Sequence, residues 1–316
     1  MSVLFVTRRL PASIEALAQQ GFDARLTASD VAIIDLAERA AGADAVLCCP
    51  GDMLDASAIA ALPASVKVIG TFSVGYDHVD VAAAKARGIR VCNTPDVLSV
   101  ATAECAMLLV LAAARRAGEG ERLVRSGGWA GWAPTQLLGT QVSGRRLGIF
   151  GMGRIGREIA RMARGFAMEI HYRDMTRLPP ELEQGAIFHG DDDSFLPLCQ
   201  FLSLNAPGGD GTRHWLSNER IAKLPAGAVV VNAARGTLVD DAALIAALRN
   251  GHVAAAGLDV YNGEPRVHPD YLTLENVVLL PHLGSATTET RDAMGRIVLA
   301  GISAILAGES PSNLVG

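Results

Sequence analysis

The stretch "IFGMGRIGREIARMARGF", residues 149–166, places three glycines between an apolar run and a helical pattern. The run that ends at Phe150 is typical of a short buried strand, and the apolar residues after the glycines recur at helical spacing. Gly151, Gly153 and Gly156 therefore occupy a tight strand-to-helix turn, where a missing Cβ lets a pyrophosphate approach the backbone. The helix adds free N–H groups and the positive end of its dipole. Ordinary loop glycines remain the alternative, because the chain contains 33 glycines.

The size and composition of the chain point to a small-molecule partner. With 316 residues, half of them apolar, the chain can form two domains with separate cores. Charged residues make up 19% and the net charge is −5, so no basic field indicates nucleic acid and no polybasic segment indicates an anionic membrane.

Neither export nor membrane insertion is expected. The N-terminal "MSVLFVTRRLP" turns polar too early for a signal peptide. The longest apolar run, Cys105 to Ala114, covers about half a membrane span and is interpreted as a buried helix. The five cysteines are odd in number and form no CxxC pair, which argues against a disulfide framework or a zinc site. We expect a cytoplasmic protein without a metal.

Short β-like runs alternate with helical stretches along the chain, which is typical of a wound α/β sheet. The alternation restarts after the glycine turn, so we predict two wound parallel-sheet domains with a cleft between them. A helix is expected from about Val100 to Arg116. The last helix, from Thr287, has no obvious place in the second sheet, and we expect it to return to the first domain. The predicted division is 1–98 plus 287–316 for substrate binding and 99–286 for the dinucleotide.

An acidic residue about 20 positions after the glycines is the second sign of a dinucleotide site, because it holds the adenosine ribose diol. Asp174 closes the next strand-like run, "EIHYRD". Its alternative role is a solvated carboxylate at a strand end. Asp174 would repel a ribose 2′-phosphate, whereas Arg173 and Arg177 could attract one. The sequence therefore favours NAD without excluding NADP.

Polar residues that packing does not require follow the later strands, in "LNAP", "NAARG", "GLDV", "YNGEP" and "PHLGSAT". Together they supply a guanidinium, two carboxylates and an imidazole at one sheet edge, which is the inventory of a reaction centre. Taken singly, Arg235 could form a surface ion pair, Glu264 could be a turn carboxylate, and His282 could be a structural histidine.

These segments resemble the D-2-hydroxyacid dehydrogenases. The resemblance runs from "TFSVGYDHVDVAAAKARGIRVCNTPDV" through "GMGRIG" and "NAARGTLVDDAALIAAL" to "AAAGLDV" and "LLPHLGSAT". "SGGWAGWAP" and "HLGSAT" are similar to segments of the glyoxylate/hydroxypyruvate reductase branch. The resemblance implies a Rossmann-like cofactor domain, a flavodoxin-like substrate domain, and catalysis by Arg235, Glu264 and His282.

The resemblance also implies binding residues. Backbone N–H groups of Val74 and Gly75 would bind the substrate carboxylate, and Asp259 would hold the nicotinamide carboxamide. In the reductase branch the tryptophan that matches Trp132 reaches across a dimer interface to the neighbour's substrate; packing within its own subunit is the alternative. With the glycines and Asp174, the expected cofactor contacts are Thr102, Arg154, Ile155, Asn205, Pro207, Thr212, Ala233, Asp259 and Gly284.

Elementary chemistry gives the three catalytic residues matching roles. Hydride transfer to a carbonyl carbon puts negative charge on its oxygen, which must be stabilised and protonated. An imidazolium at His282 can do both, and a carboxylate at Glu264 favours that charged form. The planar fork of Arg235 suits the carboxylate and keto oxygens of a 2-oxo acid. Together with this chemistry, the resemblance implies a homodimeric reductase of short 2-oxo acids such as glyoxylate and hydroxypyruvate.

Other functions on this scaffold remain open. Met175 follows Asp174 where NADP-using members of the branch often carry arginine, so a preference for NADPH is in doubt. A dinucleotide-sensing protein of the corepressor type and a dehydrogenase of another D-2-hydroxy acid are the alternatives. Glu264 speaks against formate oxidation, because formate dehydrogenases carry glutamine at the matching position. The acidic stretch "GDDD", residues 190–193, is interpreted as a solvated loop rather than a metal site.

Overall fold

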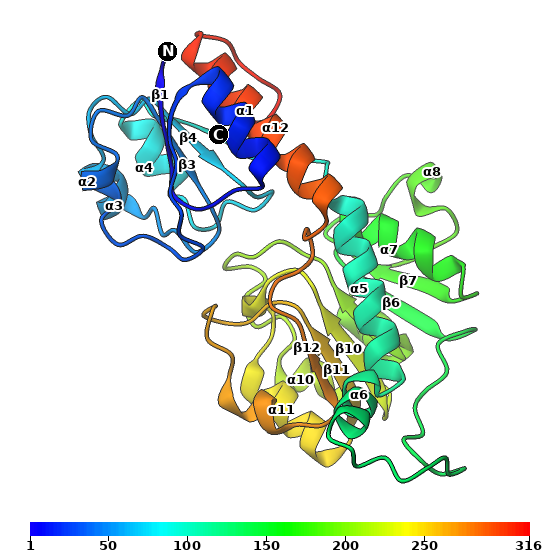
Figure 1. Ribbon diagram of the computed structural model, residues 1–316. Coiled ribbons are helices and arrows are strands. Elements are labelled where there is room, and N and C mark those ends of the chain that lie inside the picture. Colours follow the sequence, from blue (N-terminus) through cyan, green and yellow to red (C-terminus); the bar gives the residue numbers. More distant parts are fainter. The chain divides into compact units, whose positions relative to one another are not determined.

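The computed structural model describes residues 1–316, which divide into two compact units (Figure 1). Unit 1 comprises Met1–Leu98 with Ala286–Gly316, and unit 2 comprises Ser99–Ser285. The chain returns to unit 1 at Ala286, one residue before the predicted boundary at 287. Each unit is built on a wound, mainly parallel sheet, which confirms the predicted fold class. The cleft stays a prediction.

Unit 1 contains a six-stranded sheet in the order β13-β5-β4-β3-β1-β2. The strands are β1 Val3–Val6, β2 Asp23–Arg25, β3 Ala45–Cys48, β4 Val68–Thr71, β5 Arg90–Cys92 and β13 Leu314–Val315. The helices are α1 Ala12–Gly21, α2 Leu36–Arg39, α3 Ala56–Ala61, α4 Val81–Ala86 and α12 Thr288–Leu306. The order 2-1-3-4-5 of the parallel strands is that of flavodoxin-like sheets. The antiparallel strand β13 lies outside the predicted series, because two residues are too few to show alternation.

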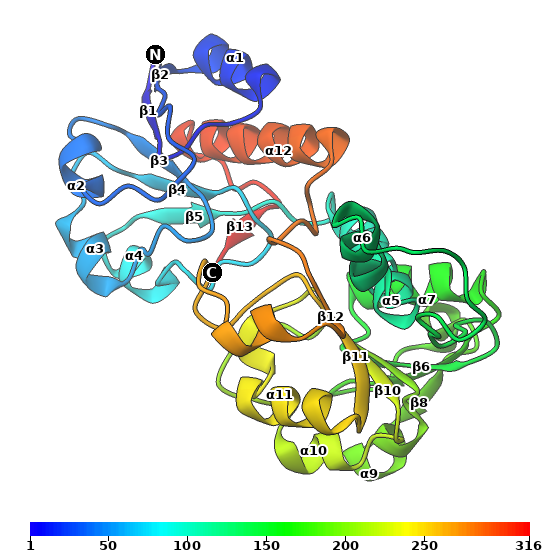
Figure 2. The same ribbon diagram turned by 60° about the horizontal axis from the view of Figure 1, so that its bottom comes forward.

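Helix α12 packs on the sheet of unit 1, beside α1 (Figure 2). Its first turn is capped by Thr287, whose hydroxyl accepts the N–H of Thr290 at 3.1 Å. A Cβ at Gly70 of β4 would lie 2.6 Å from Cδ1 of Ile302, so α12 rests directly on the strand backbone. The last helix therefore belongs to the same core as the first strands.

Unit 2 contains a seven-stranded, fully parallel sheet in the order β12-β11-β10-β9-β6-β7-β8, the Rossmann arrangement extended by one strand. The strands are β6 Arg146–Phe150, β7 Glu169–Arg173, β8 Ile187–His189, β9 Phe201–Leu204, β10 Ala228–Asn232, β11 Val253–Leu258 and β12 Val277–Leu279. The α-helices are α5 Ser99–Ala114, α6 Ala117–Arg125, α7 Arg154–Arg164, α8 Pro180–Glu183, α9 Asp192–Phe195, α10 Asn218–Ala222 and α11 Asp241–Asn250. The 3₁₀ helices are η1 Leu196–Leu198, η2 Gly236–Leu238 and η3 Pro269–Thr273.

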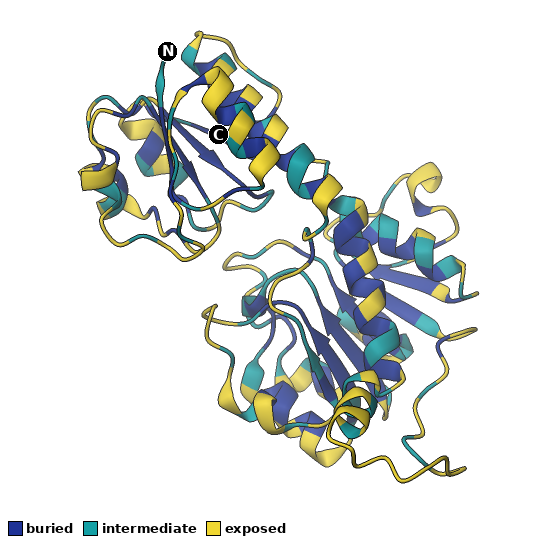
Figure 3. Ribbon diagram, viewed as in Figure 1, coloured by how far each residue is buried: buried dark blue, intermediate teal, exposed yellow.

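Both faces of this sheet are covered, and its central strands are buried (Figure 3). Helices α5 and α7 contribute to the core on one face, and α10 and α11 to the core on the other. The strand β10, "AVVVN", is buried along its whole length, as continuous apolar runs are in parallel sheets. The apolar run from Cys105 lies in α5, which packs on β10 and β11 as the predicted buried helix. None of the helices combines the length and apolarity needed to cross a membrane.

The interpretation of residues 190–193 as a solvated loop is wrong in part: Gly190, Asp191 and Asp193 are exposed, but Asp192 is largely buried and α9 begins there. Asp191 caps the short helix α9, and its carboxylate accepts the N–H of Ser194 at 2.8 Å. Asp192 pairs with arginines, and Asp193 pairs with Lys223 at 2.5 Å. The sequence pattern did not show this, because the positive partners come from distant parts of the chain.

Candidate active site

The glycine turn after β6 brings the backbone of two strands together. Gly151 has φ +93°, and a Cβ there would lie 2.5 Å from the backbone nitrogen of Ala206. A Cβ at Gly156 would lie 2.3 Å from the carbonyl oxygen of Gly151, so the third glycine lets α7 sit against the turn. A Cβ at Gly153 would meet nothing within 4 Å. The middle glycine therefore faces open space at the start of α7, where a phosphate can approach.

The first turn of α7 suits an anion. Its N-cap, Gly153, provides no side-chain acceptor for the free N–H groups, and the turn contains no acidic residue. Arg154 is exposed on this turn, and Ile155 is half-buried. No negative side chain in the first turn of α7 therefore balances the positive end of the helix dipole.

Asp174 lies directly beside the glycine turn. One oxygen accepts the N–H of Met152 at 2.7 Å, and the other accepts the N–H of Met175 at 2.7 Å. A carboxylate oxygen has two lone pairs, so each oxygen keeps the capacity to accept a hydroxyl. The arrangement fits the ribose diol of a dinucleotide whose phosphates lie at the turn.

The other predicted cofactor residues surround the carboxyl ends of the central strands. The N–H of Asn205 donates to the carbonyl of Phe150 at 2.7 Å, and the hydroxyl of Thr212 donates to the carbonyl of Pro207 at 2.7 Å. A Cβ at Gly284 would lie 3.3 Å from Cγ2 of Thr102. Ala233 follows β10 directly. The structure thus brings this set to one edge of one sheet.

Glu264 and His282 form a close pair at the same edge. Nδ1 of His282 lies 2.8 Å from Oε2 of Glu264, and Oε1 of Glu264 accepts the N–H of Tyr261 at 2.9 Å. The imidazole is 43% exposed. With Nδ1 on the carboxylate, Nε2 is the ring nitrogen that remains for a substrate.

The charge state of Glu264 follows from its neighbours. Burial opposes its ionisation, but the hydrogen bond and charge of His282 and the charge of Arg235 act against burial, and the net effect lowers the pKa of Glu264 below its ordinary 4.5. The carboxylate is therefore ionised at neutral pH and favours a protonated imidazole.

The backbone around His282 is held by Asp259, whose side chain is fully buried. Its carboxylate accepts the N–H groups of Leu283 at 2.6 Å and Gly284 at 2.8 Å, while its carbonyl accepts the N–H of His282 at 2.9 Å. His282 itself has φ +57°, a left-handed conformation that is uncommon outside glycine and asparagine. Asp259 thus fixes the strained turn that presents the imidazole.

Two residues of this support were not predicted as site residues. The thiol of Cys105, on α5, is hydrogen-bonded to Asp259. The hydroxyl of Tyr261 donates to the carbonyl of Leu280 at 2.8 Å, two residues before His282. Burial raises the pKa of Asp259, and the backbone hydrogen bonds oppose that rise. The sequence offers no signal for either residue, because both act through contacts made by folding.

Arg235 caps η2, and the carbonyl of Arg235 accepts a hydrogen bond from the side chain of Asn232 at 2.8 Å. Its guanidinium Nη1 donates to the carbonyl of Ala234 at 2.7 Å. Because its charge contributes to the lowered pKa of Glu264, the guanidinium and that carboxylate share one electrostatic environment. The predicted catalytic three therefore all lie in unit 2, at the end of one sheet.

Val74 and Gly75 lie in unit 1, after β4. The carbonyl of Val74 accepts from the Asn93 side chain at 2.8 Å, and the carbonyl of Gly75 accepts from the Ser73 hydroxyl at 2.6 Å. The N–H groups of the two residues donate to no other group of the chain. They are therefore available to an anion.

Trp132 lies in the irregular segment after α6 and is 81% exposed. The alternative that it packs within its own subunit is therefore wrong.

Comparisons with known proteins agree on one family. Residues 107–284 match the family described as D-isomer specific 2-hydroxyacid dehydrogenase, NAD binding domain. The chain is 42% identical to a glycerate dehydrogenase of Hyphomicrobium methylovorum, over 98% of this chain and 97% of that protein. It is 40% identical to a glyoxylate reductase of Thermococcus onnurineus, over 99% and 95%.

A solved structure has the same fold. The NADPH-dependent glyoxylate/hydroxypyruvate reductase of Sinorhizobium meliloti, in complex with NADP and malonate, superimposes with a TM-score of 0.87. The two chains are 31% identical, and the match covers 100% of this chain and 97% of that one.

Proposed function

Because the chain belongs to the D-isomer specific 2-hydroxyacid dehydrogenase family, we propose that it uses NAD(P)H to reduce short 2-oxo acids, with glyoxylate and hydroxypyruvate as leading substrates. The names of the relatives support both acids, since loss of the hydride at C2 of glycerate and of the proton on its C2 hydroxyl gives hydroxypyruvate. The observation that carries the proposal is the 2.8 Å contact between Glu264 and His282, at the sheet edge that also holds the glycine turn.

The residues present fit a dinucleotide. Open space at Gly153, the uncapped first turn of α7 and the carboxylate of Asp174 would hold its pyrophosphate and ribose. A bound reduced nicotinamide supplies the hydride that the reaction needs. Both carboxylate oxygens of Asp259 already accept a backbone N–H, so a nicotinamide carboxamide would have to bind in addition to these two hydrogen bonds. We therefore assign Asp259 first to holding the turn at His282.

The residues of the chain would supply the remaining chemistry. Arg235 binds and orients the 2-oxo acid through its planar guanidinium, with the N–H groups of Val74 and Gly75 on the substrate carboxylate. Nε2 of His282 donates a proton to the carbonyl oxygen as negative charge develops there. Glu264 holds the imidazole through Nδ1 and stabilises its charged form.

We infer a preference for NAD(H) over NADP(H). Asp174 would repel a ribose 2′-phosphate, and the guanidinium of Arg177 is already paired with Glu183 at 2.9 Å. We also propose a homodimer in which the exposed Trp132 lines the substrate site of the neighbouring copy.

Replacing Gly153 by alanine is expected to raise the Kd for NADH by about tenfold or more, because the added methyl group projects into the space assigned to the pyrophosphate. The backbone at Gly153, with φ −66°, is accessible to alanine, so the melting temperature should change little. Fluorescence titration with NADH and a thermal melt measure the two effects. The control is Gly21→Ala, which also places a Cβ in open space but lies at the end of α1 in unit 1. Unchanged NADH affinity would contradict the placement of the pyrophosphate.

The direct test of the proposed function is the loss of reduced-nicotinamide absorbance with NADH and NADPH in parallel, against glyoxylate, hydroxypyruvate and pyruvate. Rapid turnover of glyoxylate or hydroxypyruvate, with NADH favoured, is the expected result. Cofactor binding without turnover of any of these acids would overturn the substrate assignment. It would favour another D-2-hydroxy acid or a sensing role.

A further inference from the structure

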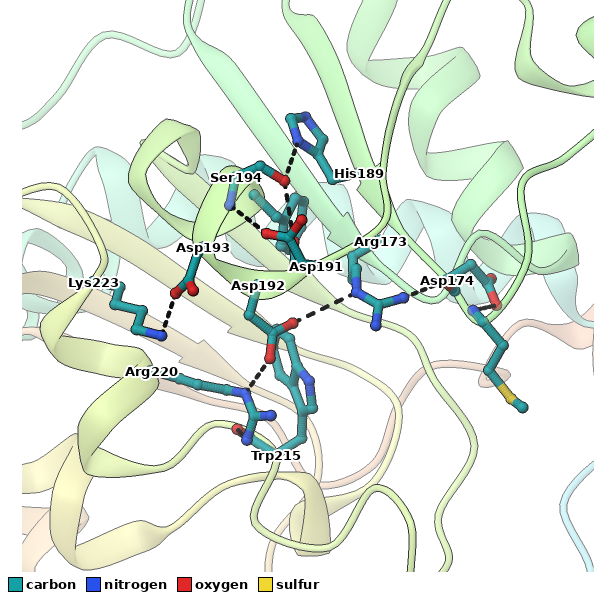
Figure 4. Close-up of polar contacts among 12 residues, drawn as sticks. Arg173, Asp174, His189, Asp191, Asp192, Asp193, Ser194, Trp215, Arg220 and Lys223 are labelled. Atoms are coloured by element: carbon teal, nitrogen blue, oxygen red, sulfur yellow. Dashed lines mark hydrogen bonds and ion pairs between the residues drawn. The ribbon is translucent and has the colours of Figure 1, made fainter.

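The three aspartates at the start of α9, Asp191 to Asp193, make different contacts, as Figure 4 shows. Asp191 caps the helix, and Asp193 pairs with Lys223 at the surface, where its side chain is 80% exposed. Asp192 is instead largely buried and stands between Arg173 and Arg220. Its Oδ2 lies 2.6 Å from Nε of Arg220, and its Oδ1 lies 3.6 Å from Nε of Arg173. One carboxylate thus serves two guanidinium groups.

Arg173 is the neighbour of the residue assigned to the ribose. It is the last residue of β7, and its Nη1 donates to the backbone carbonyl of Asp174. Its Nε and the facing Oδ1 of Asp192 are both buried, and neither has a hydrogen-bond partner. At 3.6 Å the two groups are held by charge rather than by a hydrogen bond. The position of Arg173 therefore depends on the charge of Asp192.

Arg220 links the carboxylate of Asp192 to the glycine turn through a series of contacts. Its guanidinium lies 5.3 Å from the centre of the Trp215 ring, and that ring stacks on Phe150 at 3.6 Å. Phe150 directly precedes Gly151. Asp192 thus contacts, through Arg220 and Trp215, the residue that precedes the glycine turn, although it comes from a different segment of the chain.

We propose that Asp192 is a second specificity-determining residue for the cofactor and disfavours the 2′-phosphate of NADP(H). The carboxylate of Asp192 faces the guanidiniums of Arg173 and Arg220, Asp191 adds a negative charge near Arg173, and Asp174 adds its own carboxylate, so a phosphate bearing about two negative charges finds no excess positive charge. Without the charge of Asp192, one negative charge fewer faces the phosphate, and Arg173 can turn towards the phosphate. This inference rests on the proposed function, which puts the adenosine ribose at Asp174.

Calorimetric titration of NADP⁺ and NAD⁺ into the apoprotein tests the inference without any turnover. For Asp192→Asn the Kd for NADP⁺ should fall by about tenfold, while the Kd for NAD⁺ stays within about twofold. Asp193→Asn is the matched control, because it removes one carboxylate from the same turn but affects only an exposed pair; both of its Kd values should stay at the wild-type level. The gain in NADP⁺ affinity should shrink with added salt.

A double variant distinguishes an effect of local charge on NADP⁺ affinity from an effect of a disturbed fold. In Asp192→Asn with Arg220→Gln the local charge returns to its wild-type value, so the ratio of the two Kd values should return towards the wild-type ratio. Equal weakening of NAD⁺ and NADP⁺ in Asp192→Asn, or an unchanged ratio, would overturn the inference alone. A wild-type protein that binds neither dinucleotide would overturn the proposed function together with it.

Discussion

Replacing His282 by asparagine is expected to lower kcat for the reduction of glyoxylate by about 10³-fold, because the substrate oxygen loses its proton donor. Asparagine is the appropriate replacement, since it tolerates the left-handed backbone that His282 adopts at φ +57°. The hydrogen bond from the backbone N–H of residue 282 to Asp259 can then persist. The Kd for NADH should remain close to the wild-type value.

Steady-state rates and a separate NADH titration measure the two quantities. His268→Asn is the control, because it removes an exposed imidazole that caps η3 and leaves Glu264 in place. A variant at His282 that keeps more than about a tenth of the wild-type kcat, with the chemical step rate-limiting, would remove this residue from the role of proton donor.

Replacing Glu264 by glutamine should reduce kcat by about 10²-fold or more, because an amide neither stabilises the imidazolium nor holds it as firmly. The pH profile gives a sharper readout. The pKa of Glu264 is lowered, so its carboxylate contribution is complete above about pH 4.5 and is lost as the pH falls through that lowered pKa. The acidic limb that belongs to Glu264 should be absent from the variant.

Glu275→Gln is the matched control, since it removes a carboxylate of equal length from an exposed pair with Arg122. Its profile should coincide with that of the wild type. If Glu264→Gln instead lowers kcat by the same factor at every pH, the carboxylate only shapes the loop, and its electrostatic role in the proposal is wrong.

Much of the fold and of the candidate site could be predicted from local sequence patterns. The alternation of strands and helices predicted two wound sheets, and the topology confirms both. The glycine spacing predicted the tight turn that holds Gly151, Gly153 and Gly156, and the motif series predicted the family that the comparisons show. The catalytic and cofactor roles of the site residues stay predictions until the variants are measured.

The predictions failed where partners come from distant segments. The stretch from Gly190 to Asp193 is polar, which is typical of a loop, yet Arg173, Arg220 and Lys223 neutralise two of its carboxylates. An isolated stretch of sequence contains no information about such partners.

The sequence by itself determined the class of fold, the position of the glycine turn and the types of residue at the strand ends, because spacing along one chain fixes which residues share a turn or follow a strand. The sequence led us to expect Glu264 beside His282, and the tertiary structure gives that pair its 2.8 Å contact. Only the tertiary structure decided that Asp259 holds the backbone beside His282 and that Asp192 lies between two arginines. These contacts join residues from separate elements, and parallel sheet packing, rather than local propensity, brings those elements to one edge.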